Sequence, residues 1–301
     1  IAKTIRNKRI NNGAIIFDKT EIKSELDKKN QPENIVFKTT KSSNKLIEEF
    51  MLLANKKVAE KMRKSKERFV YRVHDQPDQE KLKNLQTVVK RLGYNLKLSS
   101  NELNDSLNSL LKKAFGKNEQ NLIDTLMIRS MSKAEYTTKN IGHYGLSFEN
   151  YTHFTSPIRR YPDVMVHRLI QAEIDGEKIN TDETETLCKH STHMEILATK
   201  AERDSVKLMQ IKFMKDKEGK TFDAVISGVV ARGVFVEVIE NKCEGLVKAK
   251  DLPGDFYVHD EKNHRFVGEK TGKKYQLGDK TRVILIKADQ IKKRLDFQVL
   301  T

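Results

Sequence analysis

Residues 153–163 read His153-Phe154-Thr155-Ser156-Pro157-Ile158-Arg159-Arg160-Tyr161-Pro162-Asp163, and this stretch is the most informative in the chain. Pro162 suits the first turn of a helix, which we expect to run to about Ile174. Two adjacent arginines just ahead of a helix N-terminus oppose the helix dipole, so they indicate either a bound anion or nearby carboxylates. Two guanidinium groups can hold a phosphate, and pairing with Asp163 is the equally weighted alternative.

The sequence on both sides of this stretch predicts helices. Upstream, apolar residues recur at helical spacing, with Pro77-Asp78 as a start signal and Gly93 and Gly116 as stop signals. The four predicted upstream helices cover residues 44–62, 77–92, 103–111 and 122–127. Downstream, a pattern from Thr181 to Gly219 is long enough for one extended helix or two. The first two thirds of the chain is therefore predicted to be mainly helical.

After Gly219 the period of the apolar residues changes to that of short strands separated by Gly and Asn turns. The five predicted strands are 222–226, 234–238, 245–247, 281–286 and 294–300. Five short strands in so few residues predict a small barrel. We place the domain boundary where a charged helix end meets the first strand, which gives domains of 1–216 and 217–301.

The charge of the chain predicts a polyanionic partner. Lys and Arg number 57 and Asp and Glu 42, a formal net charge of +15. The hydrophobic fraction of 37% is too high for a disordered basic tail, so the charge lies on a folded surface and favours nucleic acid over an anionic membrane. No stretch approaches the roughly 18 apolar residues of a membrane span, and we expect no membrane partner.

The cysteines and the chain start indicate the cellular context. Cys188 and Cys243 are too few and too far apart for a disulfide framework, which fits a cytoplasmic protein. Cys188, His190 and His193 do not predict zinc, because only the two histidines share a helix face and no fourth ligand is near. The chain opens at Ile1 without Met or a signal segment, which we interpret as the interior of a longer protein.

Several motifs resemble one enzyme family. Gly142-His143-Tyr144-Gly145-Leu146, residues 153–163 and His167-Arg168-Leu169 resemble the signature of the RNB catalytic domain of the ribonuclease II and ribonuclease R family, closest to its ribonuclease R branch. Further matching segments, in the family's order, are 47–55, 71–74, 131–136 and 201–204. Residues 219–300, with an insert from Phe256 to Gly272, resemble the OB-fold RNA-binding domain named S1.

The resemblance implies a processive exoribonuclease that degrades single-stranded RNA from the 3′ end to nucleoside 5′-monophosphates, using water and Mg²⁺ bound by aspartates. Those aspartates lie in a part of the family domain upstream of the residues that match Ile1 onward. This chain has no closely spaced run of aspartates, and Asp182-Glu183-Thr184-Glu185 is expected to form a charged first helical turn. We therefore expect no metal ligands here, and a chain that binds RNA without cutting it.

The resemblance also assigns residues in the first domain. It implies that Arg159 lies beside the scissile phosphate, that Phe17 stacks on a base near the 3′ end, and that Glu48 lies near the terminal sugar. From the residues alone, Phe17 is better explained as core and Glu48 as a carboxylate near a helix N-terminus. Three residues of the same motif are also candidates for RNA contact or for scaffold: Arg160, Tyr161 and Arg168.

In the barrel, the resemblance places Phe235 where the family has a base-stacking aromatic. Arg232 replaces a second common aromatic, and Lys248 stands where histidine is usual, so backbone charge is expected to outweigh stacking. Arg294 is a further candidate contact. Phe222 and Phe297 are expected to fill the barrel.

The sequence thus predicts an α+β chain: the mainly helical C-terminal portion of an RNB catalytic domain, followed by a five-stranded OB-fold β-barrel. The expected partner is single-stranded RNA, without a small-molecule cofactor, and the expected state is a monomer. The alternative is a stand-alone RNA-binding or regulatory protein with a degenerate nuclease half.

Overall fold

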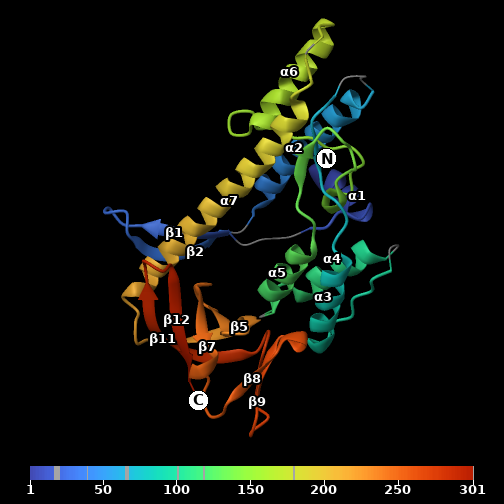
Figure 1. Cartoon of the computed structure of the whole chain (residues 1–301). Helices are drawn as coiled ribbons and strands as arrows, with labels where there is room; N and C mark the ends of the chain where they lie inside the picture. The colour runs from blue at the N-terminus through green and yellow to red at the C-terminus, as the bar shows by residue number, and fades with distance from the viewer. Residues whose placement is uncertain are drawn as a thin grey trace. The chain divides into compact units, whose positions relative to one another are not determined.

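The computed structural model describes residues 1–16, 21–38, 40–64, 68–99, 102–117, 119–178 and 180–300. They form two compact units: Ile1–Lys19 with Thr40–Ala198, and Thr20–Thr39 with Thr199–Thr301 (Figure 1). The units therefore divide within a helix, after Ala198. The family-domain boundary expected at 216/217 stays a prediction.

The first unit is mainly helical, as predicted. Its helices are α1 (Ala2–Asn11), α2 (Ser42–Met62), α3 (Gln79–Arg91), α4 (Leu103–Ala114), α5 (Gln120–Ser130), α6 (Tyr161–Asp175) and the first part of α7 (Thr184–Lys215). A two-stranded sheet joins β3 (Tyr71–Val73) to β4 (Glu135–Thr137). Within the described residues, no helix carries an apolar stretch long enough to cross a lipid bilayer.

Helices α3, α4 and α5 form where the apolar spacing predicted them. Asp78 caps α3, because its side chain accepts hydrogen bonds from the N–H groups of Glu80 and Lys81. Gly93 follows the helix with φ of +84°, a conformation that glycine adopts without strain. The buried stripes of the three helices share one core, which includes Leu82, Leu85, Leu107, Leu110, Ile123 and Met127.

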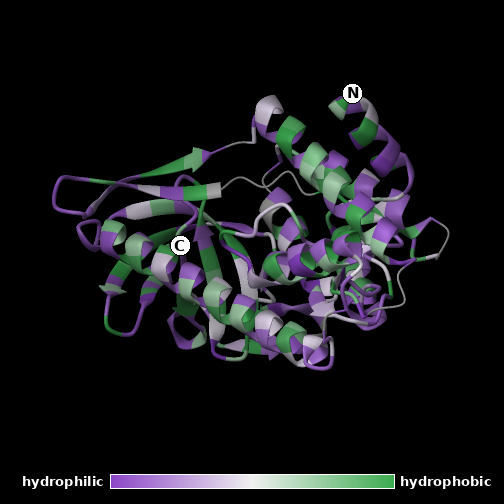
Figure 2. Cartoon of the chain, turned by 90° about the horizontal axis from the view of Figure 1, so that it is seen from above, coloured by the Kyte–Doolittle hydropathy of each residue, from purple (hydrophilic) through white to green (hydrophobic). Residues whose placement is uncertain are grey.

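A second core joins α2, β3, α6 and α7. It includes Ala59, Met62, Val70, Val166, Leu169 and Cys188. Pro162 lies in the first turn of α6 and Gly176, at φ of +69°, ends the helix, as the sequence indicated. The long pattern after Thr181, left open as one helix or two, is one helix of 32 residues. Figure 2 shows hydrophobic and hydrophilic residues mixed along the helices, as expected of helices that pack on a core with one side.

The second unit contains the predicted five-stranded barrel. The strands are β5 (Thr221–Val230), β6 (Gly233–Val238), β7 (Glu244–Lys248), β11 (Lys280–Asp289) and β12 (Arg294–Val299). They close in the order β11-β12-β7-β6-β5, with β11 also pairing with β5. Val234, Val236 and Val238 point inward and are fully buried, and Phe222 and Phe297 are buried in the same core. The barrel and its filling are therefore confirmed.

Besides the short strand β4 and the 3₁₀ helices, three features of the described fold were not predicted. One is α1, and another is a hairpin of β1 (Glu21–Leu26) and β2 (Pro32–Lys38) in the second unit, whose Ile35 lies in the barrel core. The third, which we call the insert sheet, consists of β8 (Tyr257–Asp260), β9 (Arg265–Gly268) and β10 (Lys274–Gln276). Strands β8 and β9 fall in the insert that the sequence had delimited at 256–272, and β10 lies just beyond it.

Candidate nucleic-acid interface

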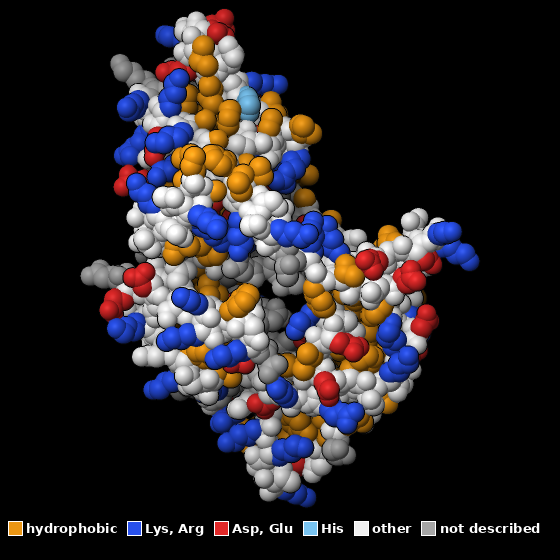
Figure 3. All heavy atoms as spheres, turned by 180° about the vertical axis from the view of Figure 1, so that it is seen from behind, with side chains coloured by type: hydrophobic (Ala, Val, Ile, Leu, Met, Phe, Trp, Pro, Cys, Tyr) orange, Lys and Arg blue, Asp and Glu red, His pale blue; other side chains and the backbone are white. Residues whose placement is uncertain are grey.

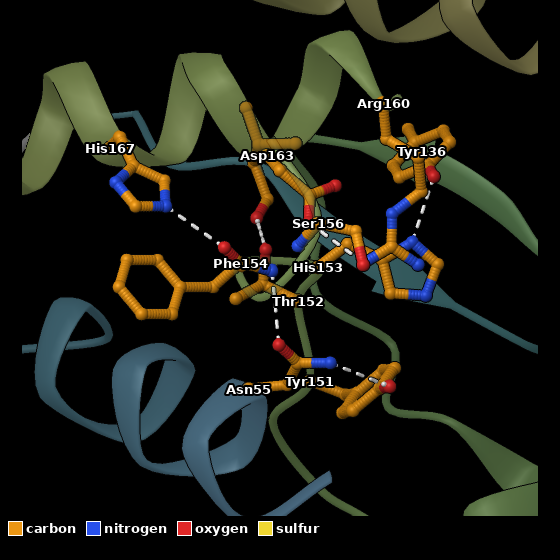
Figure 4. Close-up of polar contacts among 11 residues, drawn as sticks. Asn55, Tyr136, Tyr151, Thr152, His153, Phe154, Ser156, Arg160, Asp163 and His167 are labelled. Atoms are coloured by element: carbon orange, nitrogen blue, oxygen red, sulfur yellow. Dashed lines mark hydrogen bonds and ion pairs between the residues drawn. The ribbon is translucent and has the colours of Figure 1, made fainter. Parts of the chain in front are cut away.

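The turn that leads into α6 is fixed by one buried carboxylate. Asp163 is fully buried, and its Oδ1 atom accepts from the Ser156 N–H and from Nη2 of Arg160, each at 2.7 Å (Figure 4). The N–H groups of Arg159 and Arg160 both donate to the Ser156 carbonyl, at 3.3 and 3.1 Å. We call residues 155–163 the arginine turn. Its conformation depends on Asp163.

The two arginines of this turn differ. Arg160 is paired with Asp163, so for this residue the carboxylate alternative holds in the structure. Arg159 is exposed, and its side chain makes no ion pair or hydrogen bond with a described residue. The turn therefore presents one guanidinium group to an incoming anion and uses the other to hold itself in place.

Asn55 of α2 binds the segment that precedes the arginine turn. Its Nδ2 donates to Oη of Tyr151 at 3.1 Å, and its Oδ1 accepts from the Phe154 N–H at 3.0 Å (Figure 4). On the other side, His167 of α6 stacks on Phe154 with ring centroids 4.2 Å apart. The sequence analysis did not single out Asn55, although the residue falls on the apolar stripe of α2, where a buried polar side chain has to find partners.

A pocket of about 440 Å³ lies beside the turn, between α2 and the segment that precedes α6. Its lining combines apolar Ile47 and Met51 with polar Glu48, Thr155 and Arg160. Oγ1 of Thr155 and Nε of Arg160 are buried without a hydrogen-bond partner among the described residues, and so is Oδ2 of Asp163. Buried polar atoms of this kind normally have a partner, so the pocket is suited to a polar ligand.

Glu48 and Glu49 are adjacent on α2 but have different surroundings. Glu49 is buried and accepts from Arg9 of α1 at 2.5 Å and from Arg6 at 3.3 Å. Glu48 lies 4.0 Å from Arg6, and its side chain is 50% exposed. The buried ion pair thus holds α1 against α2 and leaves Glu48 at the pocket. The explanation of Glu48 as a carboxylate of the helix N-terminus fits less well, since the residue lies in the second turn of α2.

Two histidines near the turn, His143 and His153, contribute no charge at neutral pH. Burial, with Arg160 and Arg72 nearby, lowers the pKa of His153 to about 2. Burial and the neighbouring His74 lower the pKa of His143 to about 3. Nδ1 of His153 lies 2.8 Å from Oη of Tyr136, whose pKa burial raises to about 12. The positive charge of this region therefore comes from arginine.

The remaining described candidates of the first unit do not line the pocket. Tyr161 and Arg168 are exposed on α6, and neither is among the residues that line the pocket. Phe17 lies outside the described residues. Glu185, from the acidic stretch at the start of α7, accepts from the Thr138 N–H and hydroxyl, both at 2.7 Å, and so anchors the helix to the segment after β4.

No metal site is formed by the part of the chain that the structure describes. Within these residues, no three His, Cys, Asp or Glu side chains come together in a way that could hold an ion. Cys188 is buried in the core, and burial raises its pKa to about 12, which disfavours a thiolate ligand. The described residues therefore offer no set of ligands that fits a divalent metal.

The second unit brings its candidates together on the outside of the barrel. Phe235 points outward because Val234 and Val236 point inward, and it lies opposite Leu246, which in turn lies opposite Asp296. We call the surface of Phe235, Leu246, Arg294 and Asp296 the barrel face. Gly228 lies across from Phe235, and a Cβ there would stand 3.3 Å from the ring. The absence of a side chain at Gly228 therefore leaves room for the Phe235 ring over β5.

The basic residues of this region divide into two groups. Arg232 comes just before β6, and Lys248 is the last residue of β7. The two lie side by side in the backbone, because Lys248 is opposite Gly233 and the Ala249 N–H donates to the Arg232 carbonyl. Arg294 instead pairs with Asp296 at 3.4 Å, with side chains 43% and 13% exposed. Sequence analysis missed this neutralising partner, although residues two apart in a strand share a face.

The visible surface carries more basic than acidic side chains. In Figure 3, Lys and Arg outnumber Asp and Glu on the face shown, in keeping with the net charge of +15. The two units together define a class of protein: an α+β chain with a fixed arginine turn in its helical unit and an OB barrel with a partly basic outer face.

Comparison with known proteins identifies the family. Residues 1–176 match the model of the RNB domain, and residues 215–300 match that of the S1 RNA binding domain. The chain belongs to the RNB family, as the motifs indicated.

Its relatives include ribonuclease R proteins. Ribonuclease R of Aquifex aeolicus is 38% identical over 302 residues, which cover 99% of this chain and 43% of that protein. The apo form of Mycoplasma genitalium RNase R has a TM-score of 0.94 at 28% identity, covering 99% of this chain and 48% of that one. The same values hold for its complex with ribose methylated single-stranded RNA. The chain thus spans less than half the length of these relatives.

Proposed function

We propose that this chain is part of a processive exoribonuclease that degrades single-stranded RNA from the 3′ end to nucleoside 5′-monophosphates. Family membership and the ribonuclease R relatives support the reaction class. The single observation that carries the proposal is the guanidinium group of Arg159, which has no partner among the described residues and is carried by the Asp163-bound turn beside a pocket lined by Glu48. A fixed cation there suits a phosphodiester whose charge increases during cleavage.

The proposed roles follow from position. Arg159 contacts the phosphate of the bond to be cut, and Glu48 contacts the terminal sugar, where the 2′-hydroxyl group distinguishes RNA from DNA. Phe235 stacks on a base further along the strand, while Arg232 and Lys248 contact phosphates. Tyr161, Arg168 and Phe17 also contact RNA in this proposal, and their roles rest on the resemblance to the RNB family.

We propose that Mg²⁺ in the complete protein is bound by aspartates outside this chain, because the described residues hold no group of metal ligands. The chain alone then binds RNA without cutting it. We also propose a cytoplasmic location and a monomeric state; two buried, unpaired cysteines support the first.

The test is to incubate the purified chain with 5′-labelled single-stranded RNA, with and without Mg²⁺, and to measure cleavage on a gel and binding by polarisation. The expected result is salt-dependent binding without cleavage. Mg²⁺-dependent trimming from the 3′ end would overturn the assignment of the metal site to another segment. Absence of binding at low salt would overturn the proposed function of this chain.

Two arginine variants sharpen the test. Arg159→Ala is expected to weaken RNA binding and to reduce the slope of log affinity against log salt by about 1, because one phosphate contact is lost. Arg129→Ala is the matched control, since Arg129 is an exposed arginine on α5 of the same unit. Equal losses in both variants would show that Arg159 acts only through net charge.

A further inference from the structure

The outer face of the insert sheet exposes an aromatic residue that its own strands cannot bury. Tyr257, Phe266 and Tyr275 occupy the inner face and are buried in the barrel core. The alternation of side chains leaves Phe256 and Val258 on the outer face, 71% and 46% exposed. Phe256 is the most exposed aromatic side chain among the described residues. Turning the strands over to hide it would expose three buried aromatics.

The backbone of Phe256 is held on both sides. Its N–H donates to Oδ1 of Asp255 at 2.7 Å, and its carbonyl accepts from the Glu269 N–H at 2.9 Å. Oδ2 of Asp255 accepts from the N–H groups of Lys270 and Thr271, at 3.0 and 2.7 Å. One carboxylate therefore ties the turn that carries Lys270 to Phe256, the residue just before β8.

Gly268 makes this arrangement possible. A Cβ atom there would stand 2.5 Å from Oδ2 of Asp255 and 2.7 Å from Oγ1 of Thr271. The Thr271 hydroxyl itself donates to Asp255 at 2.7 Å. The close packing of strand and turn thus depends on the absence of a side chain at this position.

Basic residues lie on the outer face of the insert sheet and on the turn bonded to the Phe256 backbone. Val258 lies opposite Val267, and Val267 lies opposite Lys274, so one row of the outer face runs from apolar to cationic. Lys270 and Lys274 are both exposed, and neither forms an ion pair with a described residue. Glu269 is the opposing charge on the same turn. An exposed ring with cationic side chains on the same face and on the adjacent turn suits a nucleobase and its phosphates.

The size of this surface favours RNA over a protein partner. One Phe and one Val offer far less than the roughly 800 Å² per partner that a stable protein interface buries. Stacking on a base needs only one ring. Lys248 of the barrel precedes Phe256 by eight residues, so the two lie within about 28 Å of each other along the chain, a span that one RNA strand can bridge.

We propose that the outer face of the insert sheet is a second contact for single-stranded RNA, in which Phe256 stacks on a base and Lys270 and Lys274 contact flanking phosphates. The inference rests on the proposed function, since it adds a contact to an RNA-binding chain. It assigns a role to the insert that is independent of Phe235 and of the arginine turn.

The absence of tryptophan from the chain gives a direct probe. In the Phe256→Trp variant, the only indole lies at the proposed site, and its fluorescence is measured during titration with an oligoadenylate of about 16 nucleotides. We expect a saturable quench. Leu26→Trp is the matched control, because Leu26 is 47% exposed on β1 of the same unit and belongs to neither the barrel face nor the insert sheet, so its fluorescence should not change.

Affinity gives the second readout. Phe256→Ala is expected to weaken binding of the oligoadenylate roughly five- to hundredfold, the range for loss of one stacked base. Its melting temperature should match that of the unaltered chain, because the side chain is mostly exposed. Lys270→Gln is expected to reduce the salt slope by about 1.

The outcomes separate the two proposals. If the chain binds RNA and Phe235→Ala weakens binding while the fluorescence of Trp at 256 stays constant, the second contact is wrong and the proposed function stands. If the unaltered chain binds no RNA, both fail. If the fluorescence at 256 changes with protein concentration in the absence of RNA, the surface joins two copies of the chain, and the RNA assignment is overturned.

Discussion

The arginine turn and the barrel face both present a basic residue beside a carboxylate, yet the two carboxylates differ in burial. Asp163 is fully buried, and it fixes both Arg160 and the backbone of Ser156. Asp296 lies on an outer surface and pairs with an arginine that is nearly half exposed. The first pair determines a conformation, whereas the second only adjusts the charge of a surface.

The largest effect is expected from breaking the buried pair. Asp163→Ala leaves Arg160 without its partner and the Ser156 N–H without an acceptor, and should lower the free energy of unfolding by about 3 kcal/mol. Urea unfolding followed by circular dichroism measures this. Asp175→Ala, at the exposed end of the same helix, should change stability by less than about 0.5 kcal/mol. Similar stabilities for the two variants would show that Asp163 does not hold the turn.

Acid should weaken the first unit before its carboxylates titrate. The pKa values of His143 and His153 are about 3 and 2 in the folded chain, because both rings are buried, while an unfolded histidine titrates near 6.5. Below pH 6.5 the unfolded state takes up protons that the folded state does not, so stability falls as the pH falls. Between pH 6.5 and 5 we expect a loss of about 2 to 4 kcal/mol, measured by urea unfolding at each pH.

One variant isolates that histidine contribution. His153→Asn keeps a polar atom near Tyr136 and removes one titrating ring, so about half of the pH dependence between 6.5 and 5 should disappear. An unchanged dependence would mean that other groups cause the acid sensitivity. The barrel shares neither histidine, which confines this prediction to the helical unit.

The barrel depends on close backbone approach more than on a buried charge. A Cβ at Gly245 would stand 2.6 Å from the Leu295 carbonyl and from the Phe297 ring, so Gly245→Ala should cost about 1 to 3 kcal/mol. Gly228→Ala is the control: its Cβ would meet only the Phe235 side chain, at 3.3 Å, and should cost under about 1 kcal/mol. Thermal melts compare the two. An equal loss in both would contradict the distinction between backbone and side-chain obstacles.

The same contrast explains what the sequence could predict. Helices α3 to α5 and the barrel strands have strong periods, because each buries one side along its whole length. The β1–β2 hairpin has no such period: it reads EIKSEL and PENIVFK, and only Ile35 is buried among the residues with a described burial. A hairpin that packs on the barrel core through one buried side chain, Ile35, and one partly buried side chain, Ile22, leaves little pattern to detect.

For the candidate site, the motifs predicted which residues matter but not how they pair. The sequence left Asp163 as one of two explanations for the arginine pair, and only the folded turn shows that it serves Arg160 and leaves Arg159 free. Asn55 was missed because a single polar residue in an amphipathic helix has no period of its own. Its partner Tyr151 lies 96 residues away, a distance that local patterns do not span.

The smallest effect is expected at the partly exposed pair of Arg294 and Asp296 on the barrel face. Asp296→Asn keeps the shape of the side chain, removes one negative charge from the barrel face and releases Arg294, so RNA affinity should rise about two- to tenfold at low salt. Stability should change by less than about 1 kcal/mol, because the pair is partly exposed. Asp223→Asn removes the same charge from β5, where the residue pairs with Arg282 at 3.5 Å, and serves as the control for net charge. A gain confined to Asp296→Asn would show that this carboxylate restrains Arg294, whereas equal gains would reduce the effect to the overall charge of the barrel. In the first case, the buried carboxylate of Asp163 stabilises the arginine turn through Arg160, whereas the carboxylate of Asp296 only limits the contact of Arg294 with RNA.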